Sequence, residues 1–168
     1  MAPLKRYTTL AVTILAAIIV QLILISADRR DTPTKAVIEF SKAFFMFKPS
    51  MAERLCEDLH TIGGMNAVEY FLSVIAGEAR ERGFGLGYMK TRLYDVKTKT
   101  LKKDDKSAEV QLVGKRRFAM NPLYALVAQI FGFSKPQKVE TIITVRNENG
   151  RWKVCDNPLK LFYKESDT

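Results

Sequence analysis

Two cysteines are the most reactive side chains in this sequence of 168 residues. A disulfide between Cys56 and Cys155 would close a long loop and stabilise the fold by about 3–4 kcal/mol. Strand parity argues against this bridge. If Trp152 and Val154 face the helices, Cys155 faces away from them, unless the strand ends close to Cys155. The alternative is two inert apolar thiols, and the sequence leaves both interpretations open.

The single histidine and a glycine-rich segment are the other candidates for chemistry. His60 has Glu57 and Asp58 as neighbours, but a catalytic base must also face a defined reactive atom. An exposed histidine near a helix C-terminus is favourable on electrostatic grounds alone. The glycines of segment 83–87 follow a predicted helix and precede a strand, the reverse of a dinucleotide-binding loop. With two Cys and one His, a structural zinc site lacks its four ligands. We therefore predict no catalytic residue, no cofactor and no metal site.

A run of three cations precedes a short segment that is apolar on nearly every side. This segment, 121–132, starts with Asn-Pro, ends at a glycine and is too short to span a bilayer. An apolar helix must be covered by the domain itself, by another chain or by lipid, where cations meet phosphates. The candidate partner or lipid surface comprises Lys115, Arg116, Arg117, Leu123, Tyr124, Leu126, Val127, Ile130, Phe131 and Phe133.

The N-terminal segment decides in which compartment these groups lie. Residues 7–27 form an uncharged apolar run, and a helix of that length just spans a hydrocarbon core of about 30 Å. Lys5 and Arg6 precede it, which places the N-terminus in the cytoplasm. The run is longer than the apolar region of a cleaved signal peptide, and its end is a poor cleavage site. We predict a cytoplasmic stub (1–6), an uncleaved single-pass signal anchor in a bacterial inner membrane, and a periplasmic domain from residue 28.

Helical signals fill the first half of this domain. Thr32-Pro33 is a capped start for a first helix that runs to about residue 48. Ser50 and Glu53 form a capping box for a second helix, which Gly63-Gly64 would break. Asn66 caps a third helix that runs toward residue 83. Aromatic residues at helical spacing are either plain core or the lining of a ligand cavity.

The second half changes to a period of two, which is typical of antiparallel strands with one solvent-exposed face. Strands are expected near 88–100, 106–118, 138–147 and 151–156, with Asn149-Gly150 as the turn between the last two. Residues 159–168 form a polar tail that we expect to be frayed. Helices followed by a meander predict an α+β domain over 28–158, with three helices packed on one face of a curved antiparallel sheet.

The stretch from Thr32 to about Pro158 resembles the nuclear-transport-factor-2-like superfamily, including its SnoaL-like, ketosteroid-isomerase-like and cystatin-like members. The resemblance rests on the first helix (PTKAVIEFSKAFFMF), the second helix (SMAERLCEDL) and the terminal hairpin (VETIITVRNENGRWKVCDNP). It implies a strongly curved sheet wrapped around helices, forming a cone with a pocket. Enzymes of that superfamily use a pocket Asp, Tyr or His. None of these can be matched here, so no catalytic residue is carried over.

These observations leave two classes of function. The first is a non-enzymatic, membrane-anchored envelope protein whose domain binds a protein partner, a second copy of itself or a small apolar ligand. One version resembles the bitopic assembly proteins of type IV secretion systems, whose Asn-Pro motif is similar to Asn157-Pro158-Leu159. The second is a small-molecule isomerase or dehydratase, which a buried carboxylate in a pocket would favour. A pocket filled by Phe and Leu would argue against an enzyme.

The predicted periplasmic location bears on the disulfide and on the kind of partner. Disulfides form in that compartment, which favours the bridge between the two cysteines. Nucleic acid is not an expected partner there, despite the net charge of +9. Acidic residues cluster at helix starts and turns rather than among apolar positions, so the sequence favours the binding protein over the enzyme.

Overall fold

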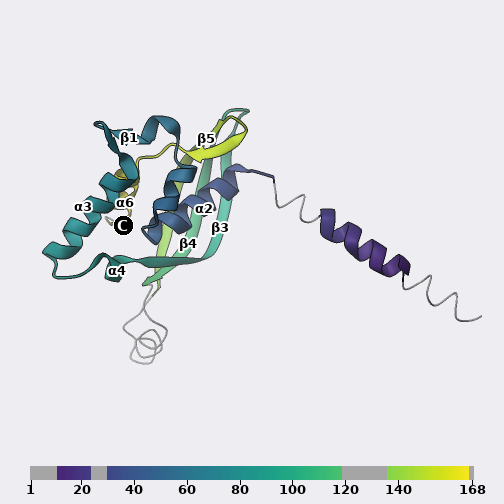
Figure 1. The fold of residues 1–168 in the computed structure, drawn as a ribbon, viewed down its shortest axis with the longest axis horizontal. Helices are drawn as coiled ribbons and strands as arrows, with labels where there is room; N and C mark the ends of the chain where they lie inside the picture. Colours follow the sequence, from purple (N-terminus) through teal and green to yellow (C-terminus); the bar gives the residue numbers. More distant parts are fainter. Residues whose placement is uncertain (1–10, 24–29, 119–135, 167–168) are drawn as a thin grey trace, which may run out of the picture. The chain divides into compact units, whose positions relative to one another are not determined.

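The computed structural model describes residues 11–23, 30–118 and 136–166 (Figure 1). The chain divides into two compact units, Met1–Asp31 and Thr32–Thr168. In the first unit, residues 11–23 form a helix within the predicted anchor 7–27, both ends of which lie outside the described residues. Across the described ranges, no helix combines the length and the apolar character that crossing a membrane requires. The helix predicted at 121–132 lies outside these ranges.

The second unit is an α+β domain, as the sequence predicts, and two of its helices start at the predicted caps. Helix α2 (Pro33–Phe45) follows Thr32, whose hydroxyl accepts a hydrogen bond from the Lys35 amide at 3.2 Å. Helix α3 (Ala67–Glu81) follows Asn66, whose Oδ1 accepts hydrogen bonds of 3.0 and 3.2 Å from the second and third following amides. These bonds satisfy amides that have no partner within the helix.

The prediction of a second α-helix is wrong. The chain instead forms two 3-10 turns, η1 (Pro49–Arg54) and η2 (Glu57–Leu59), with extended backbone at Leu55 and Cys56 between them. Leu55 forms a parallel bridge with Val154, and the Cys56 amide donates to the Val154 carbonyl at 2.8 Å. This long-range pairing holds the backbone extended at the point where an α-helix would have continued.

A small hairpin connects η2 to α3. Its strands, β1 (Thr61–Ile62) and β2 (Met65–Asn66), pair antiparallel on either side of Gly63-Gly64. The two glycines have φ angles of 59° and 83°, in the left-handed region that residues with a Cβ rarely adopt. The sequence predicts that these glycines break a second α-helix; over these described residues the structure has no such helix, and they form the turn of this hairpin instead.

Four antiparallel strands form the main sheet in the order β3-β4-β5-β6. Their bounds are Thr91–Lys103, Ser107–Phe118, Gln137–Glu148 and Arg151–Val154. The first strand starts later than predicted because a short helix, α4 (Leu86–Met89), precedes it. Figure 1 shows α2 lying against this sheet. Inward residues alternate with exposed ones along β5, and the core is formed by inward residues of the sheet together with α2, η1 and α3.

The prediction of a frayed polar tail at 159–168 is wrong for most of that segment. Helix α6 (Pro158–Ser166) follows Asn157, whose Oδ1 accepts a hydrogen bond of 2.9 Å from the amide two residues on. The ring centroid of Phe162 lies 6.1 Å from that of Phe71 in α3. This aromatic contact with a core residue orders a segment that is otherwise mostly polar.

Candidate functional site

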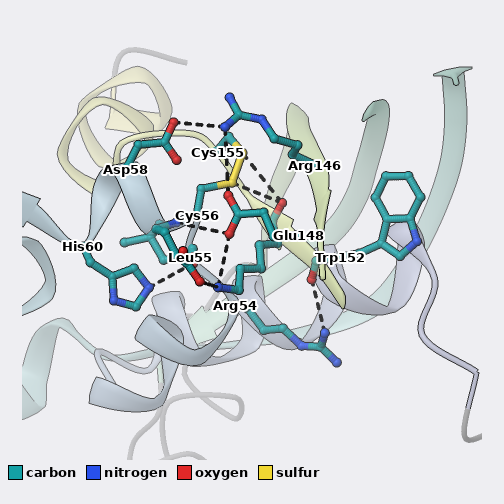
Figure 2. Close-up of polar contacts among 11 residues, drawn as sticks. Arg54, Leu55, Cys56, Asp58, His60, Arg146, Glu148, Trp152 and Cys155 are labelled. Carbon is teal, nitrogen blue, oxygen red and sulfur yellow. Dashed lines mark hydrogen bonds and ion pairs between the residues drawn. A yellow bond between two sulfur atoms is a disulfide. The ribbon is translucent and has the colours of Figure 1, made fainter. Parts of the chain in front are cut away.

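The structure joins the Sγ atoms of Cys56 and Cys155 in a disulfide (Figure 2). The two residues are 99 positions apart, and their Cα atoms lie 5.0 Å from each other. Strand β6 ends at Val154, so Cys155 has already left the strand and the parity argument against the bridge does not apply. The disulfide links the segment between η1 and η2 to the end of the last strand.

Charged side chains surround this disulfide. The Lys153 ammonium lies 3.3 Å from the Glu57 carboxylate and 3.1 Å from that of Glu148, and Arg146 lies 3.0 Å from Asp58. A hydrogen bond from its own backbone amide, followed by the bond from Arg146, lowers the pKa of Asp58. The Glu148 carboxylate is close to both sulfurs. Since those sulfurs are bonded to each other, neither is the thiolate that binds metals.

The His60 side chain forms a hydrogen bond with the nearby backbone. Its Nε2 atom donates to the Leu55 carbonyl at 3.0 Å, because a carbonyl oxygen can only accept (Figure 2). Within the described part of the chain, no hydrogen bond joins the imidazole to its acidic neighbours Glu57 and Asp58. The ring therefore closes the turn between Leu55 and η2 rather than forming part of a dyad.

An apolar pocket of about 460 Å³ lies between the C-terminal end of α2 and the inner face of the sheet. This volume falls in the range of about 300–1,000 Å³ that is typical of small-molecule sites. Seven aromatic residues and one methionine contribute most of its described lining. The described lining consists of Phe44, Phe45, Phe47, Arg82, Phe84, Tyr88, Met89, Thr91, Arg116, Phe118, Gln137 and Phe162.

Strand β4 places Arg116 in this pocket. Successive side chains of a strand face opposite sides, and Arg116 continues the inward series of Leu112 and Gly114. Its guanidinium carbon lies 5.8 Å from the ring centroid of Phe45. Its Nε donates to Oε1 of Gln137, the residue paired with it on β5, at 3.0 Å.

The other two cations of the predicted surface lie on the opposite face of the sheet. The Lys115 ammonium lies 3.0 Å from the Asp95 carboxylate, and its hydrogen bond lowers the pKa of Asp95. Arg117 lies over the ring of Tyr94, 5.4 Å from its centroid. The structure therefore divides the three-cation run instead of forming one basic patch. The remaining candidate residues of that surface, from Leu123 to Phe133, lie outside the described residues.

Sequence reasoning did not identify the far wall of the pocket. Arg82 caps the end of α3. Phe84, Tyr88 and Met89 follow it, where the sequence predicts a glycine-rich segment (83–87) and the start of a strand near 88. The signal that the sequence offered was two aromatic residues, Phe84 and Tyr88, in a segment with no predicted core role. In the structure they are 55% and 75% exposed. Among the aromatic residues that could have been core or cavity lining, Phe40 and Phe71 are fully buried core, whereas Phe44, Phe45, Phe47 and Phe118 line the pocket.

Comparison with known protein families finds no family model that matches this chain, and comparison with curated proteins finds no match either.

Proposed function

We propose that this chain is a non-enzymatic, membrane-anchored binding protein whose periplasmic domain holds a small apolar ligand in the pocket beside α2. The observation that carries the proposal is the chemistry of the lining. Its described residues are mostly aromatic and include no Asp, Glu or His. An isomerase or dehydratase needs a general acid or base within reach of its substrate. Within the described lining only Tyr88 is a side chain of that kind, and it is 75% exposed.

The proposed location rests on the sequence, with support from the cysteines. The apolar run 7–27 is our proposed anchor in the inner membrane, and a disulfide is the state expected of cysteines in an oxidising compartment. We also propose that the domain is a nuclear-transport-factor-2-like cone. The position of the pocket, between a helix and the inner face of the antiparallel sheet, supports that proposal.

Binding of a neutral fluorescent probe tests this function. The full chain would be held in lipid nanodiscs and titrated with N-phenyl-1-naphthylamine, with empty nanodiscs as the baseline. Phe118 and Ile142 form a matched pair, because they are 48% and 46% exposed and only Phe118 lines the pocket. We expect saturable binding that Phe118→Ala weakens by about tenfold, as loss of a partly buried aromatic contact predicts. Ile142→Ala should bind the probe like the wild type. Equal binding by both variants, or no signal above the baseline, would contradict the proposal.

A bitopic scaffold of a type IV secretion-like assembly is the second candidate. It is favoured by Asn157-Pro158, which marks the start of α6, with Pro158 fully buried. A scaffold subunit should self-associate in the membrane, so chemical cross-linking of the full chain in native membranes would give oligomeric ladders. A chain that cross-links only as a monomer would count against the scaffold and leave the ligand-binding proposal standing.

A further inference from the structure

We propose that the solvent-exposed rim of the pocket binds the surface of an anionic lipid bilayer. This aromatic rim consists of Phe84 and Tyr88 with the cations Arg82 and Lys90, all within nine consecutive residues of the chain. The inference rests on the proposed function, since it names the partner of the same pocket. It follows from where the domain exposes apolar side chains, from the fixed geometry of the rim and from its charge.

Exposed apolar side chains gather at the mouth of the pocket. The described part of the domain exposes six large apolar side chains, and three of them line the pocket: Phe84, Tyr88 and Phe118. The other three lie on three different strands: Met65, Leu101 and Ile142. Single exposed apolar residues are normal on a protein surface, whereas apolar surface that gathers in one place marks a binding site. Since the lining residues Phe44 and Phe45 are buried, the exposed ones form the mouth.

Backbone hydrogen bonds fix the exposed rings in place. Beyond α3, the Phe84 amide donates to the Ala79 carbonyl at 2.8 Å, and the Tyr88 amide donates at 3.0 Å to the carbonyl three residues before it. Leu86 and Met89 pack against the core. The rings of Phe84 and Tyr88 lie 6.2 Å apart and stay exposed. The segment around α4, between α3 and β3 (Figure 1), therefore presents two neighbouring aromatic rings to the solvent.

The charge of the same segment suits lipid head groups. Residues 82–94 include three cations and no acidic residue: Arg82, Lys90 and Arg92. The nearest acidic residues in the sequence, Glu81 and Asp95, lie just outside this stretch. Aromatic rings are enriched at the head-group level of a bilayer, and Lys and Arg are attracted to an anionic lipid surface. Aromatic rings flanked by cations are therefore the combination that such a surface favours.

A second copy of the chain, another protein or lipid could cover this rim, and lipid fits best. A second copy would bring its own cations against these, and like charges repel. Five residues, 28–32, separate the proposed anchor from α2, and they reach at most about 18 Å when fully extended. An anchored domain on so short a connection stays within reach of lipid head groups. An apolar ligand also partitions into lipid, so the bilayer is its natural source.

Quenching of tryptophan fluorescence by brominated lipid tests this inference, because bromine quenches an indole only at close range. The full chain would be held in nanodiscs of phosphatidylglycerol and phosphatidylcholine in equal parts, with or without bromine in the upper acyl chains. Phe84→Trp places a reporter in the rim, and Ile142→Trp is the matched control on the outer face of the sheet. The emission of buried Trp152, measured in the wild type, is subtracted. We expect severalfold stronger quenching of the reporter at Phe84→Trp than at Ile142→Trp.

Charge variants in the Phe84→Trp background test the anionic character of the surface. Replacing both rim cations, Arg82→Gln with Lys90→Gln, should reduce the quenching severalfold, as should pure phosphatidylcholine or high salt. The matched control is Lys97→Gln with Lys99→Gln, which removes two exposed cations from the face that carries Ile142. This control should leave the quenching unchanged. Quenching that ignores the loss of both rim cations would refute the role of charge.

Failure of this inference is distinguishable from failure of the proposed function. Saturable binding of N-phenyl-1-naphthylamine without quenching at Phe84→Trp refutes the lipid contact and leaves the ligand pocket intact. Equal quenching of the rim and outer-face reporters also refutes it, because the lipid would then not select this rim. Quenching at the rim without probe binding refutes the proposed function and leaves the lipid contact standing. If Phe84→Trp does not fold, Tyr88→Trp decides in its place, since the two rings are neighbours.

Discussion

Removal of the Cys56–Cys155 disulfide should lower the free energy of unfolding of the domain by about 3–5 kcal/mol. The bridge joins residues 99 positions apart, and closing a loop of that length in the unfolded chain is worth about 4.7 kcal/mol at 25 °C. The loss falls below that value where the unfolded chain keeps residual structure, which already reduces its loop-closure entropy. The variant replaces both cysteines by Ala, since a single replacement would leave a reactive thiol.

Urea denaturation of the full chain, followed by tryptophan fluorescence, measures this loss. Trp152 is the only tryptophan. It is 6% exposed, and it lies three residues before Cys155, so its emission reports on the strand that the disulfide holds. The wild type treated with reductant is the control, because it keeps both sulfurs and loses only the bond. We expect its midpoint to fall to that of the double variant. Identical midpoints for the oxidised wild type, the reduced wild type and the variant would refute the loop-closure reasoning.

Three further predictions follow from the packing and the charges. Trp152→Ala should lower the free energy of unfolding by about 3–5 kcal/mol, as for a buried aromatic, in urea unfolding followed by circular dichroism. Tyr88→Ala, at a residue that is 75% exposed, should lower it far less. Equal losses would show that Trp152 is not part of the core. Arg54→Met should lower the free energy of unfolding by about 2 kcal/mol in the fluorescence assay, because it removes a 2.6 Å ion pair to Glu39 and a 3.2 Å hydrogen bond to the Trp152 carbonyl. This loss is smaller than for a fully buried ion pair, since the Glu39 side chain is 45% exposed and water screens its charge. Unfolding midpoints should also fall as the pH drops below about 5, because carboxyl groups with a lowered folded-state pKa stabilise the domain only while ionised. A midpoint that rises on acidification would contradict this for Asp58, Asp95, Asp104 and Glu140.

The elements that sequence reasoning predicted correctly are those specified by local chemistry. Thr32 and Asn66 cap their helices through short-range hydrogen bonds, and the Asn149-Gly150 turn joins β5 and β6 with φ angles of 55° and 81°. Alternating burial along the strands follows from the pleat itself. Each of these signals is contained within a few residues, so no knowledge of the tertiary fold was needed.

The errors came from contacts between distant segments. The segment at Leu55 has helical spacing, but its pairing with Val154 makes the backbone extended. The tail is polar overall, but Phe162 packs against Phe71 and orders it. The partner lies 99 residues away along the chain in the first case and 91 in the second, and a local pattern does not contain that information.

The sequence could have identified the part of the pocket that strand β4 contributes. Strand parity alone places Arg116 on the inner face with Leu112, and Lys115 and Arg117 on the outer face. Treating the three cations as one patch missed this division. Arg82 and Met89 could not be assigned, because only the tertiary packing of the α3 end brings them to the pocket.

Photoaffinity labelling tests the proposal that this pocket binds a small apolar ligand most directly. The full chain in nanodiscs would be irradiated with an octan-1-ol analogue that carries a diazirine at the end of its chain, and adducts would be mapped by mass spectrometry. We predict adducts on pocket residues, on Phe45, Phe47 or Met89, which excess octan-1-ol suppresses and Phe118→Ala reduces. Adducts confined to the proposed anchor 7–27 or to the outer face around Ile142, or labelling that excess octan-1-ol does not suppress, would contradict the proposal.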